Sequence, residues 1–160
     1  YAASLFYAVD RFDLSKEIQK QLDEGHIVIL DRYVDSNAGH QGGKIKDPPE
    51  REKFIKWLYD TEYGIFGIPR PNLTVILHMP AEIGQRLVLQ KQERLYLGGG
   101  KKQDAHEADL EHLKNAEAAY LWLAGKYPED HVVIECVENG SIFTPEVIHE
   151  KVWQAVRSIL

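Results

Sequence analysis

Apolar and polar residues alternate in blocks along this chain, and three short apolar blocks stand out. They are residues 27–30 (Ile-Val-Ile-Leu), residues 73–77 and residues 131–136. None of them shows the strict polar–apolar alternation of a strand with one face in water, so each is typical of an interior strand covered on both faces. The pattern predicts three buried strands of a parallel sheet.

The first part of the chain has apolar residues at helical spacing, which predicts two successive helices. A first helix over residues 2–12 has an apolar face made of Leu5, Val9 and Phe12. Asp13 or Ser15 is expected to cap a second helix, and Gly25 is expected to end it. A polar, glycine-rich loop is then expected from the end of the first strand to Gly43.

Further along the chain, four helix starts can be identified from their capping residues. Asp47 precedes two prolines and has Glu50 three positions later, which is a helix start with a proline in the first turn. The remaining predicted starts are Pro80, the pair Asp104 and Glu107, and Thr144, which precedes Pro145.

Strands and helices thus alternate along the sequence, which favours an α/β fold with three layers and a parallel sheet flanked by helices. The chain has 160 residues, of which 44% are hydrophobic, enough for one compact domain with its own core. We therefore expect residues 1–160 to form a single domain.

The charge and cysteine content narrow the class of protein. A net charge of -6 and a pI near 5.6 argue against a protein that binds DNA or RNA polymers, which usually needs a basic face. One cysteine, Cys136, excludes a disulfide within the chain and is typical of a reducing compartment. There is no apolar run of membrane-spanning length, so a cytoplasmic protein without membrane contact is expected.

Candidate chemistry begins at the end of the first apolar block, where Asp31 and Arg32 follow directly. In open α/β sheets, ligands bind beyond the carboxyl ends of the strands. The planar arginine fork suits phosphate, and the aspartate can orient it or hold a ligand of Mg²⁺. An ion pair that caps the strand explains the same two residues equally well.

Two further groups of polar residues could bind a nucleotide. Tyr7 and Arg11 are four positions apart and share a helical face, where one can stack on a flat heterocycle and the other can bond its edge. A core-flanking tyrosine and a solvated arginine are the simpler alternative. The loop after Arg32 also contains side chains that can bond a sugar or base, namely Ser36, Asn37, His40 and Gln41.

A basic, glycine-rich segment lies between the predicted helices that start at Pro80 and Asp104. It contains Gly98-Gly99-Gly100, flanked by the basic residues Arg86, Arg94, Lys101 and Lys102. Such a segment could close over phosphates, and a solvated connection is the alternative. It is not itself a phosphate-binding P-loop, because Leu95 and Lys102 stand where that motif needs glycine and serine or threonine. No metal-ligand pattern is found.

In their order along the chain, these segments resemble the thymidylate kinase family of P-loop nucleoside monophosphate kinases. The resemblance rests on residues 5–11 (LFYAVDR), 31–33 (DRY) with Ser36-Asn37, Gln41-Gly42, residues 66–73 (FGIPRPNL) and residues 102–107 (KQDAHE). It covers essentially the whole chain. It implies a P-loop kinase-like fold and transfer of the γ-phosphoryl group of ATP to dTMP, giving dTDP, with Mg²⁺ carried on ATP and a homodimeric enzyme.

The resemblance also implies a role for each matching residue. Tyr7 would stack on thymine, while Arg11 and Asn37 would bond its edge. Arg32 would hold and align the acceptor phosphate beside Asp31. Ser36, His40 and Gln41 would line the same pocket, where His40 replaces the usual tyrosine or phenylalanine. Arg94 and Lys101 would be catalytic cations of a lid at about residues 92–105.

One family motif is absent from these residues. No G-x-x-x-x-G-K-[ST] sequence occurs, so the resemblance implies a fold that lacks the first strand and the P-loop here, and the isolated fragment is expected to be inactive. Two other functions stay open at this point. They are a non-catalytic nucleotide-binding fragment or pseudo-kinase, and a related kinase of deoxynucleosides or nucleoside monophosphates.

Overall fold

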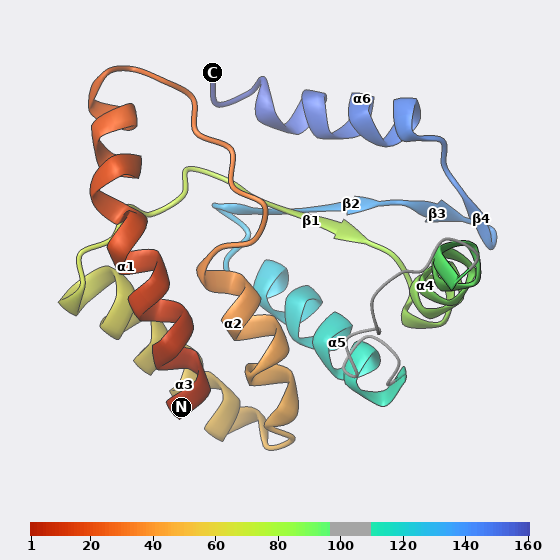
Figure 1. Ribbon diagram of the computed structural model, residues 1–160, viewed down its shortest axis with the longest axis horizontal. Coiled ribbons are helices and arrows are strands. Elements are labelled where there is room, and N and C mark those ends of the chain that lie inside the picture. The colour runs from red at the N-terminus through yellow and green to blue at the C-terminus, as the bar shows by residue number, and fades with distance from the viewer. Residues whose placement is uncertain (97–109) are drawn as a thin grey trace. The chain divides into compact units, whose positions relative to one another are not determined.

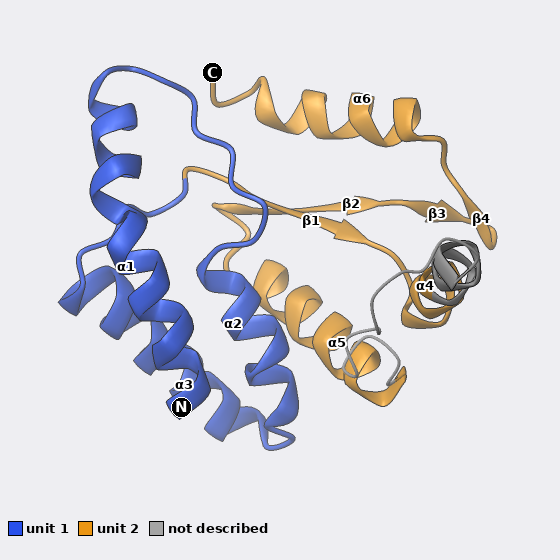
Figure 2. Ribbon diagram, viewed as in Figure 1, with its two compact units in different colours: residues 1–71 blue, residues 72–160 orange. Residues whose placement is uncertain are grey.

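A computed structural model describes the backbone of residues 1–96 and 110–160 and the side chains of residues 1–88 and 110–160. The chain divides into two compact units, unit 1 (Tyr1–Pro71) and unit 2 (Asn72–Leu160), which Figure 2 distinguishes by colour. The expectation of a single domain over residues 1–160 stays a prediction.

Unit 2 is built around a parallel pair of strands. Strand β1 (Thr74–His78) pairs with β2 (His131–Glu135), and the register places Thr74 opposite His131 and His78 opposite Glu135. Both strands coincide with predicted apolar blocks. Within unit 2, helices lie on the two sides of this strand pair, α5 on one side and α6 on the other (Figure 1). The prediction of an α/β fold with a parallel sheet between helices is confirmed.

Two helices of unit 2 begin where the sequence predicts a helix start. Helix α4 (Ala81–Tyr96) begins directly after Pro80, and α6 (Pro145–Val156) begins after Thr144, whose hydroxyl accepts a hydrogen bond from the Val147 N–H. Helix α5 spans Leu110–Lys126. The glycine-rich segment 98–102 and the capping pair Asp104 and Glu107 lie outside the described residues.

A short hairpin connects β2 to α6 and was not anticipated in the sequence analysis. Strand β3 (Val137–Glu138) pairs antiparallel with β4 (Ser141–Ile142). The turn residues Asn139 and Gly140 both have positive φ, +50° and +77°. An Asn-Gly pair suits a two-residue turn of this kind, because both residues tolerate the left-handed conformation.

Unit 1 is helical throughout its described secondary structure. Its elements are α1 (Ala2–Asp23), α2 (Val34–His40), the 3₁₀ turn η1 (Gly42–Lys44), α3 (Pro48–Tyr59) and the π-helical segment η2 (Asp60–Ile65). The start of α3 is the predicted one, because the Asp47 carboxylate accepts a hydrogen bond from the Glu50 N–H at 3.1 Å. The core of unit 1 contains the fully buried side chains of Val34, Phe54, Ile55 and Leu58.

The prediction of two helices before Gly25 is wrong, because α1 runs without interruption from Ala2 to Asp23. The Ser15 hydroxyl donates to the Phe12 carbonyl within the same helix, at 2.7 Å, and caps no new one. The predicted end is correct. Gly25 adopts φ +80°, the left-handed conformation that glycine adopts without strain after a helix.

The predicted apolar face of this helix is also not the buried one. Leu5, Val9 and Phe12 are all exposed, whereas Ser4, Ala8 and Ser15 are buried. Small side chains allow close approach between helices, and α1 contacts α2. The buried stripe is therefore selected by the fit between helices and does not follow from hydrophobicity.

The expected strand over residues 27–30 is not formed. The segment has no regular secondary structure, and Ile27 and Ile29 are 68% and 89% exposed. A strand exists only when its backbone groups pair with those of a neighbouring strand. Residues 27–30 belong to unit 1, in which the described residues form no strand. An apolar sequence without a neighbouring strand is therefore not sufficient to form a strand here.

Candidate functional site

Helices α1 and α2 are joined by a buried hydrogen bond from Asn37. Its Nδ2 donates to the Ser4 carbonyl at 3.2 Å, and both residues are buried. This bond fixes the orientation of the amide and leaves Oδ1 as its acceptor atom. The Ser4 hydroxyl is buried in the same region and has no hydrogen-bond partner among the described residues. Asn37, a predicted site residue on α2, is thus held against α1 by this hydrogen bond.

Arg11 forms a bidentate ion pair with Glu62, a residue that no pattern in the sequence points to. Nε of Arg11 lies 2.6 Å from Oε2, and Nη2 lies 2.6 Å from Oε1. The Glu62 side chain is 0% exposed and that of Arg11 is 14% exposed. Glu62 lies in η2, 51 positions away in the sequence, so no local pattern could have revealed the pair.

Tyr7 lies one helical turn before Arg11 on α1, as its spacing predicts, and is 56% exposed. An exposed ring one turn from a fixed guanidinium offers a stacking face next to hydrogen-bond donors. This combination suits a flat heterocycle that has acceptor atoms on its edge.

Tyr33, at the start of α2, lies close to the ion pair of Arg11 and Glu62. Its hydroxyl donates to the Pro69 carbonyl at 3.0 Å. Burial, and to a smaller extent the negative charge of Glu62, raise the pKa of Tyr33 to about 12, while the positive charge of Arg11 opposes the change. The phenol therefore stays protonated at neutral pH and serves as a donor that holds the entry into α2.

Asp31 and Arg32 lie at the end of the exposed segment, and both are exposed. No ion pair joins them within the described part of the chain, so a strand-capping pair is not formed there. Arg32 adopts φ +68°, which is uncommon for a residue with a side chain. Such conformations occur preferentially at functional sites, where the surrounding structure maintains them.

The expected loop of polar residues after Arg32 is largely helical, which corrects the prediction. Ser36, Asn37 and His40 lie in α2, and Gln41 follows as its C-cap. Serine, asparagine and glycine are poor helix formers, but Val34 and Ala38 on the same helix are completely buried, and tertiary packing outweighs propensity.

The other polar side chains near α2 are held by neighbours. Ser36, His40 and Gln41 are half-buried, and the side-chain oxygen Oε1 of Gln41 accepts from Lys44 Nζ at 3.1 Å. Asp35 is buried and accepts from the Tyr59 hydroxyl. Asp35 was not predicted as a site residue, and its neighbours in sequence gave no signal for it.

The side chains of the two predicted lid cations lie outside the described part of the chain. Arg94 lies in α4, of which only the backbone is described at that position, and Lys101 lies outside the described residues. The lid expected at about residues 92–105 falls on the same part of the chain.

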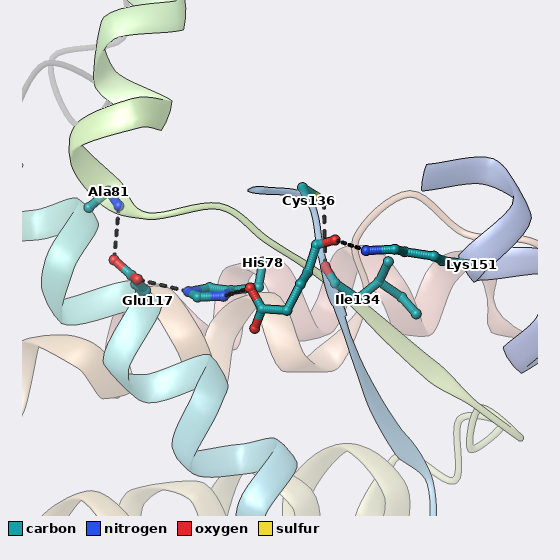
Figure 3. A network of polar contacts seen from close by, with 7 residues as sticks. His78, Ala81, Glu117, Ile134, Cys136 and Lys151 are labelled. Carbon is teal, nitrogen blue, oxygen red and sulfur yellow. Dashed lines mark hydrogen bonds and ion pairs between the residues drawn. The ribbon is translucent and has the colours of Figure 1, made fainter. Parts of the chain in front are cut away.

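In unit 2, His78 lies between two carboxylates at the carboxyl end of β1 (Figure 3). Its Nδ1 is 2.7 Å from Glu135 Oε2, and its Nε2 is 2.8 Å from Glu117 Oε1. Glu117 also accepts from the Ala81 N–H at 2.9 Å, at the start of α4, and Lys151 of α6 donates to the Glu135 carbonyl at 3.0 Å. This network joins three helices of unit 2 to the strand pair.

The two carboxylates determine how His78 titrates. Burial tends to lower the pKa of His78, but the hydrogen bonds and charges of Glu117 and Glu135 together raise it above its ordinary value. Both ring nitrogens can donate only when the ring is protonated. The network is therefore most complete with an imidazolium at position 78.

The described residues contain neither a cluster of metal ligands nor a membrane-spanning helix. No group of three or more histidine, cysteine, aspartate or glutamate side chains there could hold a metal ion. Likewise, none of the described helices is both long and apolar enough to span a bilayer.

Parallel strands flanked by helices define the chain as an α/β protein, and unit 1 brings the exposed Tyr7 ring and the Arg11–Glu62 ion pair onto or beside the same helix. A family model, thymidylate kinase, matches residues 1–140. The chain belongs to the thymidylate kinase family, whose members have the P-loop kinase fold.

Curated relatives agree with this assignment. The thymidylate kinase of Mycobacterium tuberculosis (strain H37Rv) is 31% identical over 127 residues, covering 79% of this chain and 57% of that protein. That of Nitratidesulfovibrio vulgaris is 31% identical over 163 residues, covering 99% and 69%. That of Pediococcus pentosaceus is 30% identical over 140 residues, covering 86% and 60%. The chain thus spans somewhat more than half the length of the first of these relatives.

Proposed function

We propose that this chain provides the dTMP-binding part of a kinase that transfers the γ-phosphoryl group of ATP to the 5′-phosphate of dTMP, giving dTDP. The observation that carries the proposal is the arrangement on α1, where the exposed Tyr7 ring lies one turn from a guanidinium fixed by Glu62. The names of the relatives and the family match support the same conclusion.

Recognition of the base is assigned to unit 1. Tyr7 stacks on the thymine ring, Arg11 donates to its carbonyl edge, and Asn37 accepts from the N3–H through Oδ1. The hydrogen bond from Asn37 to Ser4 supports this, because it holds the amide with its nitrogen toward α1. Ser36, His40 and Gln41 lie on or directly after the same helix as Asn37 and line the sugar side of the pocket.

Arg32 is assigned to the acceptor phosphate, with Asp31 beside it. Its side chain is exposed and makes no ion pair within the described residues, so its donors are available to an incoming phosphate. In phosphoryl transfer the protein mainly positions the groups and neutralises charge. Arg32 would therefore act by aligning the acceptor oxygen, and Arg94 and Lys101 would neutralise charge from the lid.

The described residues are assigned to dTMP and not to ATP. The sequence has no G-x-x-x-x-G-K-[ST] motif, and the described residues contain no cluster of metal ligands. The side chains that the structure describes do not fit the triphosphate of ATP or its Mg²⁺, so we assign these described side chains no step with either. We further propose a homodimer, as the family resemblance implies, and a cytoplasmic location, for which a single cysteine is typical.

The test is nucleotide binding by the chain, measured by calorimetry with dTMP, dUMP, dCMP and AMP. We expect dTMP to bind most tightly, dCMP and AMP to bind at least about tenfold more weakly, and Arg32→Ala to weaken dTMP binding by a similar factor. Lys16→Ala removes an exposed positive charge from α1 and should leave the affinity for dTMP unchanged. Equal affinities for all four nucleotides would contradict the proposal.

A further inference from the structure

The ion pair between Arg11 and Glu62 leaves one edge of the guanidinium unused by Glu62. Glu62 takes the N–H groups on the Nε and Nη2 edge, both at 2.6 Å. The opposite edge, formed by Nη1 and the second N–H of Nη2, keeps its donors. These donors form a planar fork, and the carboxylate fixes the plane in which the fork lies.

Stability alone does not account well for this arrangement. Removing a carboxylate completely from water is costly, and buried ion pairs often contribute little more to stability than apolar residues of the same size. Glu62 also lies in a π-helical segment, a rare form that occurs frequently at functional sites. Both observations point to a role in fixing the guanidinium, because an unrestrained arginine side chain samples many rotamers.

We infer that Glu62 is a positioning residue for base recognition, and that it holds Arg11 so that the free edge of its guanidinium meets the 4-oxo group of a pyrimidine stacked on Tyr7. This inference rests on the proposed function. A pyrimidine with a 4-oxo group presents an acceptor to these donors. A 4-amino group is itself a donor, so it would leave the buried donors of Arg11 unpaired.

The inference makes Glu62 a determinant of the choice between dTMP and dCMP. A side chain that served only the folding of unit 1 would affect the binding of both nucleotides to the same extent. A side chain that holds Arg11 in register with the base edge affects dTMP and leaves dCMP, which gains nothing from Arg11, largely unchanged. The ratio of the two affinities therefore separates the two roles.

The experiment measures dTMP and dCMP binding by the chain with Glu62→Gln, which has nearly the same shape but no charge and one acceptor fewer. We expect the affinity for dTMP to fall about tenfold and the dTMP-to-dCMP ratio to fall with it. Asp60→Asn is the matched control, since Asp60 lies in the same segment but makes an exposed ion pair with Lys56. It should change neither affinity.

Two further variants keep the test decisive. Arg11→Lys keeps the positive charge beside Glu62 but has no fork, so it should reduce the ratio as Glu62→Gln does, even if the latter folds poorly. In an Arg11→Met background, Glu62→Gln should have no further effect on the ratio.

An unchanged ratio in both Glu62→Gln and Arg11→Lys, with dTMP still bound by the unaltered chain, would overturn the inference and leave the proposed function standing. A parallel fall in both affinities would overturn it as well, since that result indicates a structural role. A failure of the unaltered chain to bind dTMP would overturn the proposed function and the inference together.

Discussion

His78 makes the stability of unit 2 depend on pH, and this can be tested by replacing it with glutamine. In the protonated form the ring donates to Glu117 and to Glu135, at 2.8 and 2.7 Å. In the neutral form one ring nitrogen carries no proton and faces a carboxylate with its lone pair. Glutamine is neutral at every pH, and both of its N–H donors are on one nitrogen, so it does not reproduce the two separate charged donors of the imidazolium ring.

The size of the expected change in the free energy of unfolding follows from how exposed Glu117 and Glu135 are. A hydrogen bond between charged groups contributes about 1.5–3 kcal/mol when it is shielded from water. Glu117 is mostly buried, so its hydrogen bond should contribute an energy near this range. The Glu135 side chain is 54% exposed, so its hydrogen bond should contribute much less. We therefore expect His78→Gln to lower the free energy of unfolding by about 2–3 kcal/mol at low pH and by about 1 kcal/mol at high pH.

The sign follows from the direction of the pKa shift. The pKa of His78 is raised in the folded protein, so folding favours the protonated ring. The additional stability is fully present below the unfolded-state pKa of about 6.5 and disappears as the pH rises through the higher folded-state pKa.

The assay is urea unfolding of the unaltered chain and of His78→Gln at about pH 6, 7.5 and 9. A difference of 1 kcal/mol corresponds to about 2–4 °C in melting temperature for a chain of this size, so calorimetry provides a second measurement. His149→Gln is the control, because His149 is exposed on α6. A difference between the two proteins that stays constant from low to high pH would refute the reasoning.

Two further predictions concern unit 1. Ser4→Ala should raise the free energy of unfolding by about 1 kcal/mol, because the buried Ser4 hydroxyl has no partner among the described residues and alanine is the better helix former. Urea unfolding measures this change. A loss of stability would show that the hydroxyl forms a hydrogen bond in solution. Arg32→Gly should be about 1 kcal/mol more stable than Arg32→Ala, because only glycine adopts φ +68° without strain. Both variants should weaken dTMP binding to the same extent, as measured by calorimetry. Equal stabilities of the two variants would contradict the left-handed backbone at position 32.

The sequence by itself determined those features that depend on neighbours within a few residues. Asp47 and Thr144 start helices because each side chain reaches a backbone N–H three positions later. Gly25 ends α1 for an equally local reason. The apolar blocks that became β1 and β2 could be identified because buried parallel strands are apolar on both faces.

Tertiary structure decided the rest, and the reason is the same in each case. The apolar residues 27–30 form no strand, because a strand requires a neighbouring strand to pair with, and the sequence does not specify which segments pair. The buried face of α1 consists of small residues, because fit against α2 selected it. Arg11 meets Glu62 across 51 positions, and His78 meets Glu117 and Glu135 across 39 and 57 positions. Interactions of this range depend on how the chain folds back on itself, which the order of residue types along a single sequence does not specify.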